Sequence, residues 1–270
     1  MRVVVAGATG LIGSRTVIGL RGHGVEVVPV SRGTGVDVAT GQGLSRALRG
    51  ADVIVDVMDA PARAEAVSTE FFGATTTNLL RSAATAGAEH YVVLSLVGAD
   101  RVRTGYFRAK AVQEDLARRS PLPHTIVRAT PFFETVEALS RPGTPRNDVP
   151  VAPVALRPVC AVDVAALVAR AAVSTPRFGH LEIAGPEEYR LDELTAELIA
   201  SRGELREVVT HPRTPFLGTV LSSRALLSDP AAHVGRGTLA QWLAEHGEPS
   251  VRWHRACHGA SAEDESVCHL

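Results

Sequence analysis

The sequence predicts an α/β protein with a doubly wound, mainly parallel β-sheet, helices on both faces and a small C-terminal cap. Two observations support this prediction. Short, Val-rich segments alternate with helical segments of ten or more residues through the first half of the chain, a pattern typical of right-handed βαβ units. The first apolar segment also runs directly into a glycine-rich turn that precedes a helical segment.

The strands predicted in the first half are short and apolar, as expected for strands buried on both faces of a sheet. They span residues 2–6, 25–30, 53–57, 91–96 and 125–128. The helices predicted between them span residues 11–21, 44–49, 69–86 and 105–119. In the longest of these helices, apolar side chains recur at helical spacing, namely Phe72, Leu79, Leu80 and Ala83.

The regular alternation ends after Phe133. Segment 141–158 is rich in proline and also contains Gly143 and Asn147, so we expect a loop or cap connection there. Further on, 162–173 and 191–202 predict helices, while 180–184 and 206–210 predict strands. We therefore expect a core at 1–134, a region interleaved with it at 135–249 and a flexible tail at 250–270.

Composition narrows the functional classes. The chain has 270 residues, 45% of them hydrophobic, which is enough for one large domain with a sizeable core. A net charge of −1 gives no general attraction to nucleic acid or membrane, and the apolar runs are too short to span a bilayer. With three cysteines and no leader pattern, we expect a cytoplasmic protein that binds a small molecule, as a monomer or a homodimer.

The glycine-rich turn has the sequence Gly7-Ala8-Thr9-Gly10-Leu11-Ile12-Gly13. Gly7 permits a tight turn, Gly10 lets backbone N–H groups approach a pyrophosphate, and Gly13 lets the helix pack close to the sheet. The helix N-terminus then faces the phosphates with its positive end. We expect Gly7, Thr9, Gly10, Leu11, Ile12 and Gly13 to bind a dinucleotide, the alternative being a turn without a ligand.

The second predicted strand ends in Ser31-Arg32, with no carboxylate at that position. A hydroxyl and a cation suit the 2′-phosphate of NADP, whereas NAD sites place a carboxylate there. We therefore expect NADP, with NADPH preferred over NADH, although a solvated arginine is an alternative. Asp37 lies a few residues further on and could either bond the adenine amino group or cap the next turn.

Lys110 is the only lysine among 28 basic residues, which favours a position that needs a compact, titratable ammonium. It lies four residues after Tyr106, so both side chains occupy one face of the predicted helix. A buried ammonium would lower the pKa of the phenol towards neutrality and make Tyr106 a general acid. Ser95, at the end of the fourth strand, could donate to the same substrate oxygen. An inconsequential surface pair is the alternative.

Two cysteine-containing features carry less functional weight. Cys160 lies in an apolar stretch and is expected in the core rather than as a nucleophile. The tail contains His254, Cys257, His258, Cys268 and His269 in a spacing that matches no structural zinc site, so we predict no metal.

Several of these motifs occur in an order that resembles the short-chain dehydrogenase/reductase superfamily, and more narrowly its atypical, NmrA-like or NAD(P)H-binding branch. The resemblance covers about residues 1–245. The matching positions are Gly7 to Gly13, Ser31-Arg32, Ser95, Tyr106 with Lys110, Thr130-Pro131-Phe132-Phe133, Val162-Asp163-Val164-Ala165, Ala184-Gly185-Pro186-Glu187 and Leu191-Asp192-Glu193-Leu194.

The resemblance implies a Rossmann core with bound NADP, a small C-terminal substrate-binding cap, and Thr130, Pro131, Phe132 and Phe133 flanking the nicotinamide. From its place in the Tyr106–Lys110 pair, Lys110 could also hold the nicotinamide ribose. We expect an oxidoreductase that reduces a small carbonyl, quinone or enone, possessing an aromatic or polyketide-like skeleton of secondary metabolism. The alternatives are an NADP-sensing regulator without turnover, and a non-redox isomerase, dehydratase or cyclase.

Overall fold

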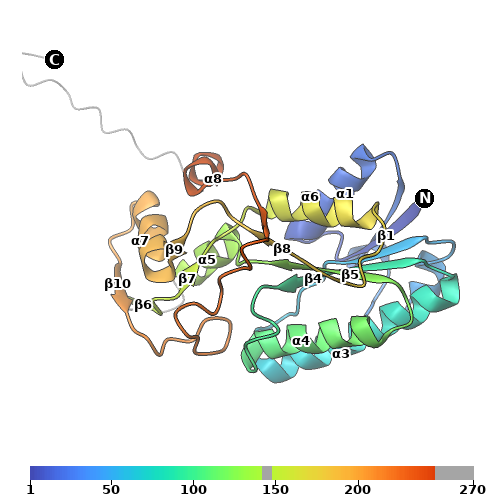
Figure 1. The fold of residues 1–270 in the computed structure, drawn as a ribbon, viewed down its shortest axis with the longest axis horizontal. Helices are drawn as coiled ribbons and strands as arrows, with labels where there is room; N and C mark the ends of the chain where they lie inside the picture. The colour runs from blue at the N-terminus through green and yellow to red at the C-terminus, as the bar shows by residue number, and fades with distance from the viewer. Residues whose placement is uncertain (142–147, 247–270) are drawn as a thin grey trace, which may run out of the picture.

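The computed structural model describes residues 1–141 and 148–246, and within them the centre is a seven-stranded sheet (Figure 1). The strand order is β11-β8-β5-β4-β3-β1-β2, and all neighbours in it are parallel. The predicted doubly wound parallel sheet is therefore confirmed. The strands are β1 (Arg2–Ala6), β2 (Glu26–Val30), β3 (Val53–Asp56), β4 (His90–Leu96), β5 (His124–Ala129), β8 (Gly179–Ala184) and β11 (His233–Val234).

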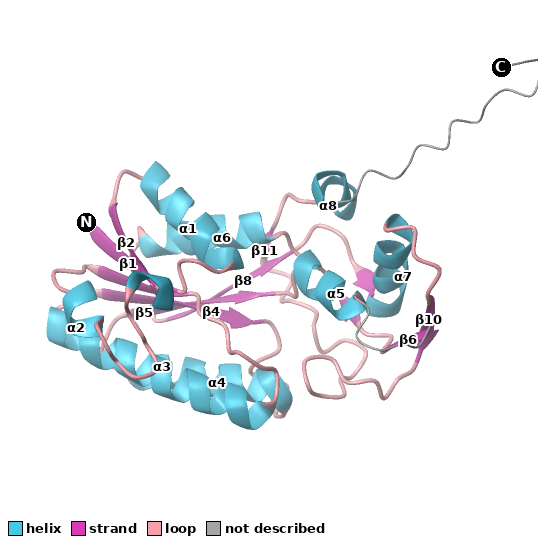
Figure 2. Ribbon diagram, turned by 180° about the vertical axis from the view of Figure 1, so that it is seen from behind, coloured by secondary structure: helices cyan, strands magenta, loops and turns pink. Residues whose placement is uncertain are grey.

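Helices cover both faces of this sheet (Figures 1 and 2). On one face lie α1 (Leu11–Gly22) and α6 (Ala161–Ala172), and on the other α2 (Leu44–Ala47), α3 (Glu65–Ala86) and α4 (Gly105–Arg119). The alternation of side chains along β1 explains this arrangement. Val3 and Val5 pack towards α1 and α6, whereas Val4 and Ala6 pack towards α2 and α3.

A smaller lobe lies beyond the carboxyl ends of the strands (Figure 1). Its apolar core includes Phe133, Leu194, Leu198 and Trp242. It contains two small sheets, a parallel pair of β6 with β10 and an antiparallel pair of β7 with β9. Its elements are α5 (Phe133–Ser140), β6 (Asp148–Val151), β7 (Ala155–Leu156), β9 (Tyr189–Arg190), α7 (Leu191–Ser201), β10 (Glu207–Thr210) and α8 (Leu239–His246).

The second half departs from the sequence prediction in several places. The expected loop at 141–158 contains β6 and β7, and the helices α5 and α8 were not predicted. From the region 135–249, α6, β8 and β11 return to the main sheet and its helical layer, while the other elements form the smaller lobe. The assignment of that region to substrate remains a prediction, and the tail 250–270 lies outside the described residues.

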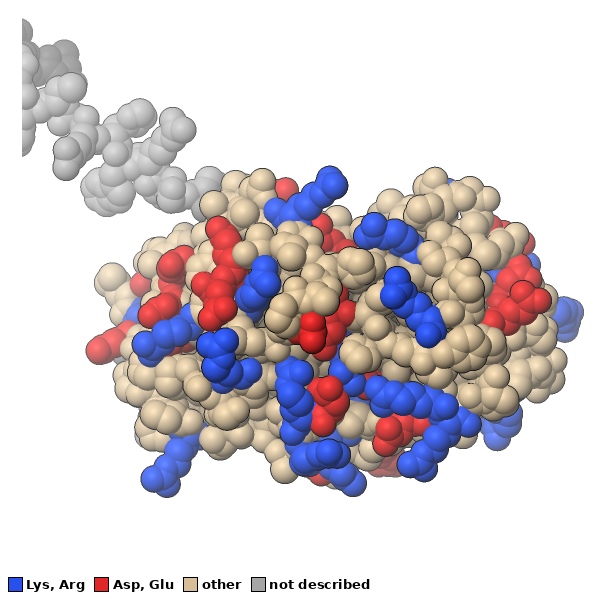
Figure 3. Space-filling model, viewed as in Figure 1, with Lys and Arg blue, Asp and Glu red and all other residues tan. Residues whose placement is uncertain are grey.

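The surface shows basic and acidic side chains interspersed on the face drawn in Figure 3. Along residues 1–141 and 148–246, no helix has the length and apolar character needed to cross a membrane.

Candidate functional site

A cleft of about 980 Å³ opens at the carboxyl ends of the central strands. The turn after β1, the end of β2, the turn after β3 and the ends of β4 and β5 line it, and α4 and α5 complete it. The chain passes from β1 to β2 on one side and to β3 on the other. In doubly wound sheets, ligands bind in the crevice that forms where the strand order reverses in this way.

The glycine turn forms the part of this cleft that follows β1. Gly7 has a φ of +84°, and a Cβ atom there would lie 2.9 Å from the carbonyl oxygen of Val57. Gly10 precedes α1 without a side-chain cap, so the first N–H groups of the helix remain available. Thr9, Leu11 and Ile12 also line the cleft. This arrangement fits the pyrophosphate of a dinucleotide.

Gly13 has a different place from the other glycines of the turn. It does not line the cleft, and a Cβ atom there would lie 2.0 Å from the carbonyl oxygen of Gly7. The absence of a side chain therefore lets α1 pack directly on the turn, as its position in the motif predicts.

The end of β2 supplies two candidate ligands for a phosphate. The Oγ atom of Ser31 is buried and has no hydrogen-bond partner among the described residues. Arg32 lines the cleft beside it and forms no ion pair with the described part of the chain. An unpaired hydroxyl next to an unpaired cation fits a 2′-phosphate group.

Asp37 also lines the cleft, but its carboxylate serves the following turn. The Oδ1 atom accepts hydrogen bonds from the N–H groups of Ala39 at 2.9 Å and Thr40 at 3.3 Å. Of the two roles that the sequence left open for Asp37, the structure shows that of capping the turn. A contact with adenine remains a prediction.

Lys110 lines the inner wall of the cleft and is almost fully buried, with 4% of its surface exposed. Its ammonium donates to the carbonyl oxygen of Leu94 at 2.7 Å and to Oε1 of Gln113 at 2.6 Å, and lies 4.2 Å from the ring centroid of Phe72. Burial lowers the pKa of Lys110 to about 8. The single lysine of the chain therefore lies where burial and nearby charges can shift its protonation.

Tyr106 lies one helical turn before Lys110 and has 7% of its surface exposed. Its hydroxyl donates to Oδ1 of Asp59 at 2.6 Å. Burial, followed by the negative charge of Asp59, raises the pKa of Tyr106 well above its usual value. The expectation that Lys110 lowers this pKa towards neutrality is therefore wrong for this state, because burial and the adjacent carboxylate both raise it.

Asp59 and Arg63 are candidate site residues that the sequence analysis missed. Two hydrogen bonds, of 2.5 and 2.7 Å, join the guanidinium to the carboxylate, and Cζ of Arg63 lies 4.5 Å from the Tyr106 ring centroid. Although burial opposes it, Arg63 holds the pKa of Asp59 below its usual value. Both residues lie just beyond β3, at the sheet edge where ligands bind in doubly wound folds, and this position in the sequence could have identified them as site candidates.

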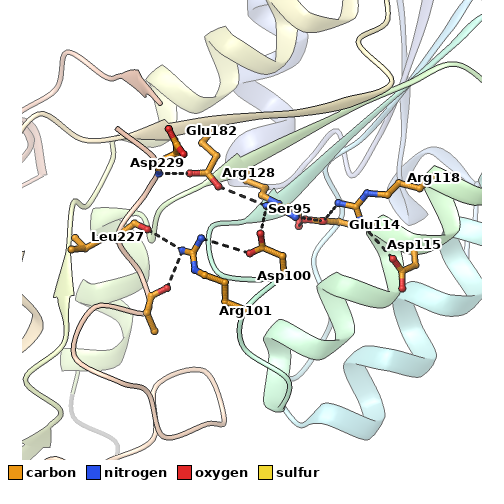
Figure 4. Close-up of polar contacts among 11 residues, drawn as sticks. Ser95, Asp100, Arg101, Glu114, Asp115, Arg118, Arg128, Glu182, Leu227 and Asp229 are labelled. Atoms are coloured by element: carbon orange, nitrogen blue, oxygen red, sulfur yellow. Dashed lines mark hydrogen bonds and ion pairs between the residues drawn. The ribbon is translucent and has the colours of Figure 1, made fainter. Parts of the chain in front are cut away.

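Ser95 reaches the cleft at the end of β4, but its hydroxyl points into a buried ionic network (Figure 4). The hydroxyl donates to Oε1 of Glu114 at 2.6 Å. Arg128 donates to both oxygens of the same carboxylate, at 2.9 and 2.7 Å. The hydroxyl proton of Ser95 is thus engaged by Glu114 in this state, and a contact with a substrate oxygen remains a prediction.

The network continues from Arg128 towards the C-terminal part of the chain (Figure 4). Nη1 of Arg128 donates to Asp100 at 2.8 Å and lies 3.8 Å from Glu182. Glu182 in turn accepts the N–H group of Asp229 at 2.7 Å. Arg101 donates to the carbonyl oxygens of Ala225 and Leu227. These contacts attach segment 225–229 to β8 and to the turn after β4.

The segment after β5 is divided between the cleft and the core. Thr130, Pro131 and Phe132 line the cleft, where Oγ1 of Thr130 donates to the carbonyl oxygen of Arg157 at 2.5 Å. Phe133 is fully buried, and its ring stacks on Trp242 with centroids 5.7 Å apart. Phe133 therefore does not line the cleft, because its side chain fills the core of the smaller lobe, and its place beside the nicotinamide stays a prediction.

The cysteine predictions have different outcomes. Cys160 is buried, and burial raises the pKa of its thiol to about 11, so its predicted core position is confirmed. His254, Cys257, His258, Cys268 and His269 lie outside the described residues. In residues 1–141 and 148–246, no group of three or more His, Cys, Asp or Glu side chains could hold a metal ion.

Comparisons with known proteins agree with this geometry. A family model described as NAD(P)H-binding matches residues 7–174, whereas no curated protein matches the chain. Among solved structures, an NADPH-dependent quinone oxidoreductase from Escherichia coli is similar, with 19% identity, a TM-score of 0.59, and coverage of 79% of this chain and 78% of that one.

Two further structures show the same fold. The triphenylmethane reductase of Citrobacter sp., complexed with NADP(H), has 17% identity and a TM-score of 0.60, covering 78% of this chain and 79% of that one. The UDP-glucose 4-epimerase of Thermotoga maritima has 18% identity and a TM-score of 0.67, covering 89% of this chain and 96% of that one. At these identities the likeness concerns the fold alone.

Proposed function

Since this chain belongs to the NAD(P)H-binding family and has an oxidoreductase-like fold, we propose that it is an NADPH-dependent reductase of a small carbonyl, quinone or enone. One observation carries the proposal. The cleft lined by the glycine turn is also lined by Tyr106, a buried phenol that holds its proton beside Lys110. A dinucleotide site and a proton donor therefore share one cavity.

The binding part of the proposal assigns one group of residues to each phosphate. Gly7, Gly10 and the first N–H groups of α1 would hold the pyrophosphate. Ser31 and Arg32 would hold the 2′-phosphate, which supports NADPH over NADH. When bound, the reduced nicotinamide supplies a hydride.

In the chemical part of the proposal, Tyr106 supplies the proton that a reduced carbonyl oxygen requires. Its high pKa keeps the phenol protonated at neutral pH, which suits a donor in the reducing direction. Because the hydroxyl donates to Asp59 in this state, the substrate oxygen has to replace that carboxylate as the acceptor. Lys110 would compensate the negative charge left on the phenolate.

The substrate class rests on the walls of the cleft near Tyr106. Pro61, Phe71 and Leu217 give it an apolar lining, whereas Asp59 and Arg63 form a polar rim. An aromatic or polyketide-like carbonyl compound matches this combination of an apolar body and one polar group. The quinone and triphenylmethane reductases among the similar structures bear names that agree with such substrates.

The first test is a fluorescence titration with NADPH and NADH, followed by absorbance of the reduced nicotinamide with a panel of quinones, enones and aryl ketones. We expect tighter binding of NADPH and substrate-dependent oxidation. Binding without oxidation would refute the reductase and favour a sensor, whereas conversion of a substrate without net oxidation would favour an isomerase, dehydratase or cyclase.

The variant Tyr106→Phe tests the proposed proton donor. General acid catalysis contributes roughly a hundredfold to ten-thousandfold in rate, so turnover should fall within that range while NADPH affinity stays unchanged. Wild-type turnover in this variant would remove Tyr106 from the mechanism.

A further inference from the structure

A buried series of polar contacts leads from Lys110 away from the cleft. Nζ of Lys110 donates to Oε1 of Gln113 at 2.6 Å, and Nε2 of Gln113 donates to Oδ2 of Asp56 at 3.0 Å. The hydroxyl of Tyr91 donates to the same Oδ2 atom at 2.7 Å. Gln113, Asp56 and Tyr91 are fully buried.

The contacts of Asp56 indicate that it is ionised despite its burial. Oδ2 accepts two hydrogen bonds from Tyr91 and Gln113, and Oδ1 accepts the N–H group of Met58 at 3.1 Å. The amide nitrogen of Gln113 and the N–H group of Met58 can only donate, so these two contacts favour the carboxylate over the protonated acid. Burial raises the pKa of Asp56 above its usual value, although the Tyr91 hydrogen bond and the charge of Lys110 oppose that effect.

The orientation of Gln113 follows from its two neighbours. Its carbonyl oxygen faces the Lys110 ammonium, and its amide nitrogen faces the Asp56 carboxylate. The reversed amide would place an NH₂ group against the ammonium and an oxygen against the carboxylate, so both contacts would become repulsive. The side-chain amide therefore couples two opposite charges through hydrogen bonds.

The other charged groups around Lys110 are engaged elsewhere. Asp59 is paired with Arg63, and Glu114 is paired with Arg128 and Arg118. Asp56 forms no ion pair with an arginine in the described residues. The remaining ionisable neighbours are the phenols of Tyr106 and Tyr91. Asp56 is thus the carboxylate around Lys110 that no arginine contacts within the described residues.

We infer that Asp56 and Gln113 are positioning residues that hold Lys110 as an ammonium at the inner wall of the cleft. Although burial depresses the pKa of Lys110 to about 8, Asp56 is the strongest of the influences that raise it. Without this carboxylate, a buried lysine would lose its proton near neutral pH. The role of Lys110 in turnover rests on the proposed function, whereas its charge state does not.

Because Lys110 is the one lysine in the chain, its charge can be measured without signals from other lysines. Full-length protein labelled with ¹³C at the lysine ε-carbon gives one lysine signal, whose chemical shift follows protonation of Nζ. A pH titration of the wild type, Asp56→Asn and Gln113→Met would give the pKa of Lys110 in each. Asp115→Asn is the matched control, since it removes a carboxylate from the exposed side of α4.

We expect the midpoint in Asp56→Asn to fall by roughly one pH unit or more, because an opposite charge nearby is worth about that much. Gln113→Met should also lower it, and Asp115→Asn should leave it unchanged. If Asp56→Asn does not fold, the titration midpoint of Lys110 in Gln113→Met alone tests the inference. A wild-type midpoint in the folded variants would overturn the inference, and because the titration contains neither NADPH nor substrate, that result is separate from a failure of the proposed reductase.

Discussion

Replacing Gly13 with alanine tests how closely α1 has to approach the glycine turn. The new Cβ atom would lie 2.0 Å from the carbonyl oxygen of Gly7, 2.7 Å from its carbonyl carbon and 2.9 Å from Cα of Ala8. Real Cβ atoms stay at 3.0 Å or beyond, so the helix and the turn must separate by about 1 Å. All three contacted atoms belong to the backbone, so no side-chain rotation can relieve the clash.

The expected cost follows from two opposing effects. A forced shift of packed backbone costs about 3 kcal/mol, the upper end of the usual range for overpacked sites. Alanine recovers about 1 kcal/mol over glycine inside a helix. We therefore expect a net destabilisation of about 2 kcal/mol. The same shift moves the first N–H groups of α1, so NADPH affinity should fall by more than roughly tenfold.

Urea unfolding would measure the stability, and a fluorescence titration with NADPH would measure the affinity. Gly73→Ala is the matched control, because Gly73 lies within α3 and an added Cβ atom there meets nothing within 4 Å. We expect this control to gain up to about 1 kcal/mol and to bind NADPH normally. Wild-type stability and affinity in Gly13→Ala would refute the reasoning.

Three further predictions concern Arg32, Glu114 and His90. Arg32→Ala should weaken NADPH binding by roughly ten- to a hundredfold and leave NADH binding unchanged in a titration with each nucleotide, since one charge-assisted contact is removed. Glu114→Gln should lower the free energy of unfolding in urea by about 3 kcal/mol, the low end of the range for a broken buried pair, because Arg128 would lose this carboxylate but keep Asp100. Asp115→Asn removes only an exposed partner of Arg118 and should cost less than about 1 kcal/mol. Burial lowers the pKa of His90 to about 4, so on acidification His90 takes up a proton in the unfolded chain before it does so in the folded protein. In thermal unfolding, the contribution of neutral His90 to stability should be complete above pH 6.5 and should fall by about 3 kcal/mol towards pH 4. A His90→Gln variant that keeps the full pH dependence would count against this cause.

The first half of the fold was predictable because its signals are local. The strand from Arg2 to Ala6 and the helix from Gly105 to Arg119 end where the sequence pattern ends. Elements in the second half depend on distant partners. β6 pairs with β10, some sixty residues further on, and β7 pairs over two residues with β9. Such short strands leave no periodicity in the sequence.

The site was predictable where backbone geometry determines it. The glycine turn and the shared face of Tyr106 and Lys110 follow from spacing alone. The partners of those side chains depend on tertiary contacts, so the contact of Tyr106 with Asp59 could not be derived in this way. Glu114, however, lies four residues after Lys110 on the same helical face, and that spacing placed a carboxylate within reach of Ser95.

The buried pair of Arg128 and Glu114 also limits how this sequence can diverge. Both side chains are almost completely enclosed, and each is a buried, hydrogen-bonded ionic partner of the other. Changing either one alone to an apolar residue leaves the other buried charge with only its more weakly placed partners, Asp100 and Glu182 for Arg128 or Arg118 for Glu114, whereas changing both together can be close to neutral. Descendants of this chain should therefore retain both residues or replace both, so positions 114 and 128 should vary as a pair even though neither is expected to touch the substrate.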